Sequence, residues 1–119
     1  MKIKNIAEKI SDLLKQEISN FKLLALVTDT SYEVLLYIKE DGEYIQVNNL
    51  LEEKRVIWND LEGFYDYIAE EIRNSIEFNA EKMNIFKMDS KGESKLEYEE
   101  RNCRIYGLKK EWKKESLIM

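Results

Sequence analysis

The sequence predicts an α+β domain: an antiparallel sheet of about five strands with helices packed over one face, in the order α-β-β-β-α-β-β-α. Three observations predict this class. Two long segments repeat apolar residues three and four positions apart, which is typical of amphipathic helices. Short aliphatic and aromatic runs separated by turn sequences are typical of β-hairpins. The chain of 119 residues is 44% hydrophobic, so residues 1–119 fit a single domain with a sizeable core.

The first helix is expected near residues 2–19. Its apolar stripe contains Ile6, Ile10, Leu13, Leu14, Ile18 and Phe21. Residues 21–28 then form a dense apolar run, short enough for a strand that is covered on both faces. Thr28-Asp29-Thr30-Ser31 reads as the turn that ends it.

Two further strands should follow as a hairpin. Residues 32–39 are rich in β-branched and aromatic side chains, and residues 43–47 form a second short run of the same kind. Between them lies Asp41-Gly42, the strongest short-range hairpin signal in this chain. With the preceding strand, these runs predict a three-stranded antiparallel meander.

The second helix is predicted over residues 60–78, after a connection that ends at Trp58. Asn59 or Asp60 can cap this helix, and Asn59 followed by Glu62 resembles a capping box, in which both side chains satisfy free N–H groups at a helix start. The expected buried stripe consists of Leu61, Phe64, Tyr65, Ile68, Ile72 and Ile76.

The last third of the chain predicts another hairpin and a short helix. Residues 82–88 and 93–99 are the strands, joined by Asp89-Ser90-Lys91-Gly92. We expect Leu96 and Tyr98 to point inward. Ile105, Leu108 and Trp112 have helical spacing near the C-terminus.

Composition removes most kinds of catalysis. The chain has no histidine, which excludes serine and cysteine triads as well as the common histidine-containing zinc motifs. Its four glycines are too far apart for a phosphate-binding loop. The one cysteine, Cys103, has no histidine to activate it and lies beside acidic residues that raise its pKa. We therefore expect no catalytic residues, no metal and no cofactor.

The composition also indicates the cellular compartment in which the protein works. No run of apolar residues is long enough to span a membrane, and the N-terminus lacks the apolar core of a secretory signal. A single cysteine cannot form an internal disulfide, which favours a reducing environment. These features predict a cytoplasmic protein that is not bound to a membrane.

The negative charge of the chain is concentrated in its middle. Residues 40–81 contain twelve carboxylates and three basic residues, a net charge of −9, while the whole chain carries −5. Glu62, Asp66 and Glu70 lie four residues apart, so they share one face of the second helix. Like charges at this spacing cost roughly 0.2–0.5 kcal/mol per pair. This face is either a docking site for a basic partner or a solvated surface.

The residues predicted to bind a partner lie mostly on that helix. They are Glu62, Asp66, Tyr67, Glu70 and Glu77, with Asp41 and Glu43 of the hairpin turn as a second, weaker group. Three aromatic residues lie beside the acids. We expect Tyr65 in the core, Trp58 closing the helix start over the core, and Tyr67 exposed.

Five segments of the chain, taken in order, resemble one family. They are Ile6-Ala7-Glu8-Lys9-Ile10, the strand 32–37, the aromatic and acidic helix segment 64–72, the hairpin 85–99 and the basic tail 109–114 around Trp112. The chain resembles the YezG-type immunity proteins, small antitoxins of bacterial polymorphic-toxin and contact-dependent inhibition systems, over nearly its full length. The hairpin pattern D-x-x-G-x-x-x-x-x-Y and the tail tryptophan are its main motifs. One departure is Phe78-Asn79-Ala80-Glu81, where the family often has a tryptophan.

The resemblance implies a non-enzymatic immunity protein that binds and neutralises a cognate toxin domain, often a nuclease. Nuclease domains are usually basic because their substrate is a polyanion, so an acidic surface would be attracted to them. The resemblance leaves the oligomeric state open.

Three other functions are weighed against this one. A secretion chaperone for an effector protein is also small, acidic and α+β, but works as a dimer. An enzyme that uses carboxylates alone would need a pair of acids in one cleft. Nucleic-acid binding through the tail 109–114 conflicts with the negative charge of the chain, so we expect no nucleic-acid partner.

Overall fold

A five-stranded antiparallel sheet forms the middle layer of the protein, with strand order β3-β2-β1-β4-β5. The computed structural model describes residues 2–117, apart from the side chain of Ile3. The helices and strands are α1 (Ile3–Leu14), β1 (Phe21–Val27), β2 (Tyr32–Glu40), β3 (Glu43–Gln46), the 3₁₀ helix η1 (Val47–Leu51), α2 (Trp58–Arg73), β4 (Met83–Asp89), β5 (Ser94–Glu99) and α3 (Ile105–Ser116). The predicted α+β class and element order are therefore confirmed, with η1 added.

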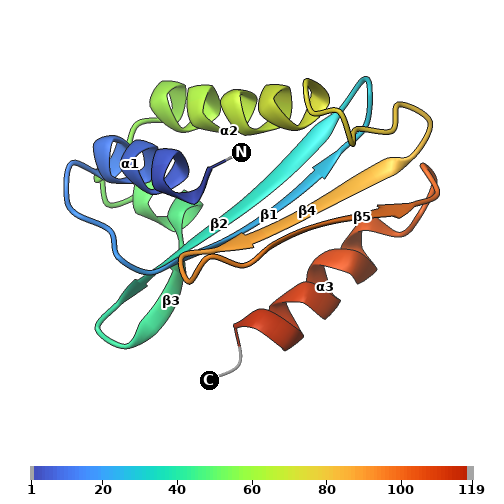
Figure 1. The fold of residues 1–119 in the computed structure, drawn as a ribbon. Coiled ribbons are helices and arrows are strands. Elements are labelled where there is room, and N and C mark those ends of the chain that lie inside the picture. Colours follow the sequence, from blue (N-terminus) through green and yellow to red (C-terminus); the bar gives the residue numbers. More distant parts are fainter. Residues whose placement is uncertain (1, 118–119) are drawn as a thin grey trace.

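The expectation that helices cover one face of the sheet is wrong, because α3 packs on the other face. Figure 1 shows α1 and α2 above the sheet and α3 below it. The larger core lies under α1 and α2, and a smaller core joins Leu24 and Leu26 of β1 to Trp112 of α3. Since β1 is apolar on both of its faces, both need a cover. The dense apolar run that predicted a doubly covered strand therefore also required the third layer.

The two long helices are shorter than predicted. The left-handed conformation of Lys15, with φ of 55°, ends α1 at Leu14, although Ile18 remains buried in the loop that follows. An apolar stripe continued by a loop looks like a longer helix in the sequence. At α2 the predicted cap at Asn59 or Asp60 is wrong, because the helix begins at Trp58 and its N-cap, Ile57, makes no side-chain hydrogen bond.

The C-terminal end of α2 and the last hairpin also differ in part from expectation. Ile76, expected in the buried stripe, lies beyond Arg73 and is fully exposed. Leu96 is half-buried, as its inward position requires, whereas Tyr98 is 44% exposed on the same side of β5. Tyr98 is held there by donating its hydroxyl hydrogen to the carbonyl oxygen of Glu77.

The β2–β3 hairpin has the predicted two-residue turn. Asp41 and Gly42 both have positive φ, 50° and 82°, which this kind of turn requires and glycine adopts without strain. β3 is short, however, and pairs only with the stretch from Tyr37 to Glu40. The first half of β2 therefore extends past its neighbour at this edge of the sheet.

An ion pair fixes the turn end of β2. The Arg55 guanidinium donates two hydrogen bonds to the Glu40 carboxylate, one of them from Nη1 at 2.8 Å. These bonds are the main reason that the pKa of Glu40 falls from 4.5 to about 2. Charged forks of this kind are the strong class of surface ion pair.

We expect Glu40→Gln to lower the free energy of unfolding by roughly 0.5–1 kcal/mol at neutral pH, the usual range for a partly exposed pair. Because the pKa is lower in the folded state, the pair stabilises the fold above about pH 4.5 and loses this effect as the pH falls towards 2. Urea unfolding from pH 7 to pH 2 should show the gap between the two proteins closing. Glu43→Gln is the matched control, because Glu43 is an exposed carboxylate across the same turn that takes part in no ion pair within residues 2–117, and this change should lower the free energy of unfolding at neutral pH by less than Glu40→Gln does.

Candidate functional site

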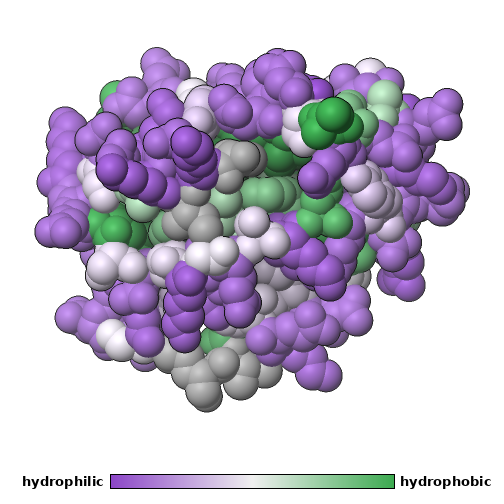
Figure 2. Space-filling view, viewed as in Figure 1, coloured by the Kyte–Doolittle hydropathy of each residue, from purple (hydrophilic) through white to green (hydrophobic). Residues whose placement is uncertain are grey.

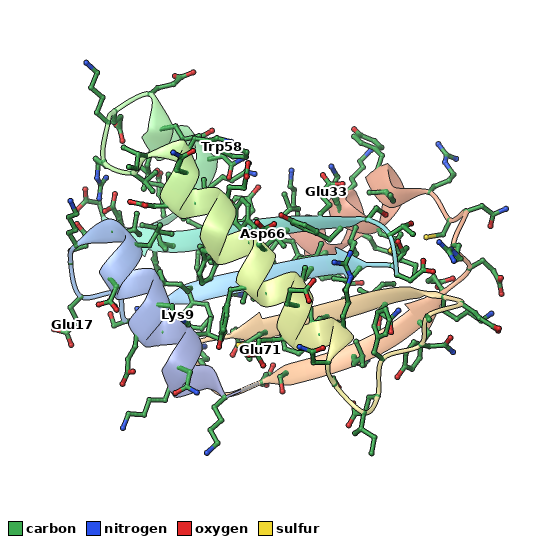
Figure 3. The ribbon with its side chains drawn as sticks, turned by 90° about the horizontal axis from the view of Figure 1, so that it is seen from above. Lys9, Glu17, Glu33, Trp58, Asp66 and Glu71 are labelled. Carbon is green, nitrogen blue, oxygen red and sulfur yellow. The ribbon has the colours of Figure 1, made fainter. Side chains whose placement is uncertain are left out.

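A groove of about 370 Å³ lies between α2 and the free edge of β2. We call it the β2-edge groove; its lining residues are Tyr32, Glu33, Val34, Trp58, Glu62, Tyr65 and Asp66. Figure 3 shows Trp58, Asp66 and Glu33 on one side of α2, whereas Lys9 and Glu71 lie on the other side. Glu33 and Val34 point to opposite faces of the strand, so the groove follows the strand edge itself.

The helical repeat of α2 places the acids of the groove. Leu61, Tyr65 and Ile68 are buried against the sheet. Glu62 and Asp66, one position after Leu61 and Tyr65, are turned towards the β2 side and are exposed. Tyr65 forms the floor, where it donates its hydroxyl hydrogen to Asn48, and burial raises its pKa. The two carboxylates are thus held on a rigid, well-packed helix.

Asp66 is bonded to the strand as well as carried by the helix. The Tyr32 hydroxyl donates to its carboxylate. Burial, and next the bond to Asp66, raise the pKa of Tyr32 to about 12. The phenol therefore stays neutral at physiological pH, and the charge of the contact is that of Asp66 alone.

Arg73 is a cation close to this surface, with its guanidinium carbon 5.9 Å from the ring centre of Tyr32, and it serves the fold. Its Nε donates to the carbonyl oxygen of Thr28 at 3.0 Å, and its Nη2 to that of Ser31 at 3.1 Å, so it ties the end of α2 to the β1–β2 turn. Its Nη1 also pairs with Glu70 at 3.1 Å. Of the three acids spaced along α2, Glu70 is therefore compensated.

The groove keeps two carboxylates without a cation. Glu33 is paired with Lys109 of α3 at 2.5 Å. Glu62 and Asp66 take part in none of the ion pairs formed within residues 2–117. The negative potential at this edge therefore comes mainly from these two side chains.

Trp58 lies at the helix end of the groove, and the prediction that it closes over the core is wrong. It is 50% exposed, and the neighbouring Ile57 is 60% exposed, while Val56 takes the buried position at the helix start. A half-exposed tryptophan beside uncompensated acids is typical of a protein-binding surface, where aromatic residues act as anchors.

The other predicted binding residues lie elsewhere. Tyr67 points towards α1 and is only partly exposed, with Lys9 Nζ 4.3 Å from its ring centre. Asp41 and Glu43 are exposed at the hairpin turn, at the opposite end of β2 from Tyr32. The second, weaker group of predicted binding residues, Asp41 and Glu43, is therefore separate from the β2-edge groove.

Glu77 lies past the end of α2, so its predicted place on the helix is wrong. It borders a second hollow, lined by Ile72, Phe86 and Leu96 together with Glu71 and Lys95. Figure 2 shows mostly hydrophilic side chains on this face, with hydrophobic ones visible between α2 and the sheet. Glu77 and the β2-edge groove are on different sides of α2.

The structure also bears on two kinds of chemistry, a reactive cysteine and a metal site. Burial, and then the charge of Glu99, raise the pKa of Cys103, which keeps its thiol protonated at neutral pH. Within the described part of the chain, no three histidine, cysteine or acidic residues are grouped so that they could hold a metal ion.

None of the helices described between residues 2 and 117 is long and apolar enough to cross a membrane.

Comparison with known proteins finds no family model and no curated protein that matches this chain. The geometry of the site therefore carries the functional argument. Sequence reasoning missed Trp58, Tyr32 and Glu33 as site residues. Tyr32 and Glu33 begin a strand whose predicted range, 32–39, is three residues longer than that of its hairpin partner, 43–47. This difference in length, which is five residues in the structure, was the available signal.

Proposed function

We propose that this chain is a cytoplasmic immunity protein, which neutralises a toxin domain by binding it directly. The β2-edge groove is the proposed contact surface. The observation that carries the proposal is the combination of half-exposed Trp58 with two unpaired carboxylates, Glu62 and Asp66, on one rigid edge. The resemblance to YezG-type immunity proteins supports the same function.

The physical logic is complementarity of charge and shape. A nuclease domain carries positive charge where it holds phosphates, so an acidic groove attracts it and speeds the encounter. Charge alone gives little affinity at a wet surface, and the anchor must be apolar and desolvated. Trp58 and Ile57 provide such an anchor next to the acids.

The proposal is tested by co-expression in bacteria. The first step is to look for a neighbouring gene that encodes a large secreted protein with a variable C-terminal domain, and that domain is the second protein in the experiment. We expect expression of that domain alone to stop growth, and co-expression of this chain to restore it. Size-exclusion chromatography with light scattering should show a one-to-one complex.

Three results would overturn the proposal. They are the absence of such a neighbouring gene, growth arrest that persists in the presence of this chain, and rescue without a complex. A dimer of this chain that holds an unfolded segment of the effector would instead support the secretion chaperone.

A further inference from the structure

Among the residues that the structure describes, 2–117, no strand pairs with the outer side of the first half of β2. β3 ends its pairing with β2 at Tyr37, opposite Gln46, and the chain then turns into η1. Figure 1 shows β3 beside only one end of the long β2 strand. Backbone groups of the stretch from Tyr32 onwards therefore face the β2-edge groove.

The hydrogen-bond pattern shows which groups these are. The N–H of Thr28 bonds to the carbonyl oxygen of Ser31, and the N–H of Lys39 to that of Asn20. Antiparallel partners exchange bonds at alternate residues, so odd-numbered residues of β2 bond to β1 and even-numbered ones face outward. Ile38 and Glu40 use their outward groups to pair with β3. The N–H and C=O of Tyr32 and Val34 have no partner in the ladders or loops of residues 2–117.

The other free edge of the sheet, β5, is less suited to receive a strand. Its exposed Lys95 pairs with Glu97 at 2.6 Å, and Glu97 also pairs with Lys87 at 3.3 Å. Charged side chains that are already paired along an edge are a common protection against strand addition. At the β2 edge Glu33 is paired with Lys109, but Glu62 and Asp66 of the neighbouring α2 have no cation within residues 2–117. The aromatic side chain of Trp58 lies beside the same open backbone.

We propose that an extended, basic segment of the partner adds to the sheet as a sixth strand beside the stretch from Tyr32 to Leu35. This proposal rests on the proposed function and specifies how the toxin domain binds. The open length fits about four residues, at about 3.3 Å per residue. Alternate side chains of the added strand face α2, where Lys or Arg would meet Glu62 and Asp66 and an apolar residue would meet Trp58.

A second copy of this chain is a poorer occupant. Two β2 edges placed side by side would bring the unpaired acids of both copies together, and like charges at an interface are unfavourable. A basic strand supplies the opposite charge and satisfies the free N–H and C=O groups at the same time. Charge complementarity therefore selects the partner over self-association.

The test is residue-resolved amide hydrogen exchange of the isotope-labelled chain, alone and in complex with the unlabelled toxin domain. We expect exchange at Val34 to slow by about 100-fold or more in the complex, because its N–H becomes hydrogen-bonded. Glu33 and Leu35 bond to β1 and should be protected in both states. The backbone N–H of Leu96 faces away from β4 at the other edge of the sheet, and its exchange rate should be the same in the free chain and in the complex.

Each outcome decides one of the two proposals. A complex in which Val34 exchanges as fast as in the free chain overturns strand addition and leaves the immunity function standing. Protection of Leu96 in place of Val34 moves the partner to the β5 edge and also overturns it. Failure to form any complex, with growth not rescued, overturns the immunity function itself.

Discussion

Reversing the two unpaired charges of the β2-edge groove should slow binding of the toxin domain sharply. For Glu62→Lys combined with Asp66→Lys, we expect the association rate at low salt to fall by about tenfold to hundredfold. At roughly 0.5 M salt the difference should shrink to within about threefold, since screening then acts over about 4–5 Å. Surface plasmon resonance at several salt concentrations measures both effects.

A matched variant separates the site from the overall charge. Glu8→Lys with Glu17→Lys changes the net charge by the same amount, at exposed acids of α1 and the loop after it. Figure 3 shows Glu17 far from Asp66 and Glu33. This control should lose far less than the groove variant. Equal losses in both would mean that only net charge matters, and thermal melts must confirm that both variants are folded.

Removing Trp112 should cost the most stability of any change on α3. It is 4% exposed, packs on the ring of Tyr37 with centroids 5.8 Å apart, and joins the second core under β1. We expect Trp112→Ala to lower the free energy of unfolding by about 3–5 kcal/mol, the range for large aromatic residues deleted from a core. Equilibrium unfolding in urea gives this value.

Tyr106→Ala is the control on the same helix. Tyr106 is 71% exposed, and we expect a change within about 0.5 kcal/mol. If Trp112→Ala cost no more than this control, α3 would not form a real third layer. The protein would then depend on the core beneath α1 and α2 alone.

Local patterns were enough to predict the class of fold. The two apolar stripes, the Asp41-Gly42 turn and the alternating strands each report on a few neighbouring residues, and the elements they predicted are present. The element ends were harder, because Lys15 ends α1 by a backbone conformation and the apolar spacing runs on to Ile18. The position of α3 on the second face depends on which surfaces remain uncovered, and that is a property of the whole sheet.

The site was predictable only in part. Helical spacing placed Glu62 and Asp66 on one helix face, and both side chains line the same groove in the structure. The sequence could not show that Arg73 compensates Glu70, because Arg73 is held there by bonds to the distant β1–β2 turn. It also could not bring in Glu33, which reaches the groove from a strand far away in the chain.

The most decisive measurement uses the two tryptophans of the chain as reporters. The chain is labelled with 5-fluorotryptophan, and fluorine NMR spectra are recorded with and without the unlabelled toxin domain; Trp58→Phe assigns the two signals. Trp58 borders the acidic groove, and Trp112 lies buried under the opposite face of the sheet. If the groove binds the partner, the Trp58 signal shifts on complex formation and the Trp112 signal stays in place. A complex that leaves the Trp58 signal unchanged would contradict binding at the β2 edge.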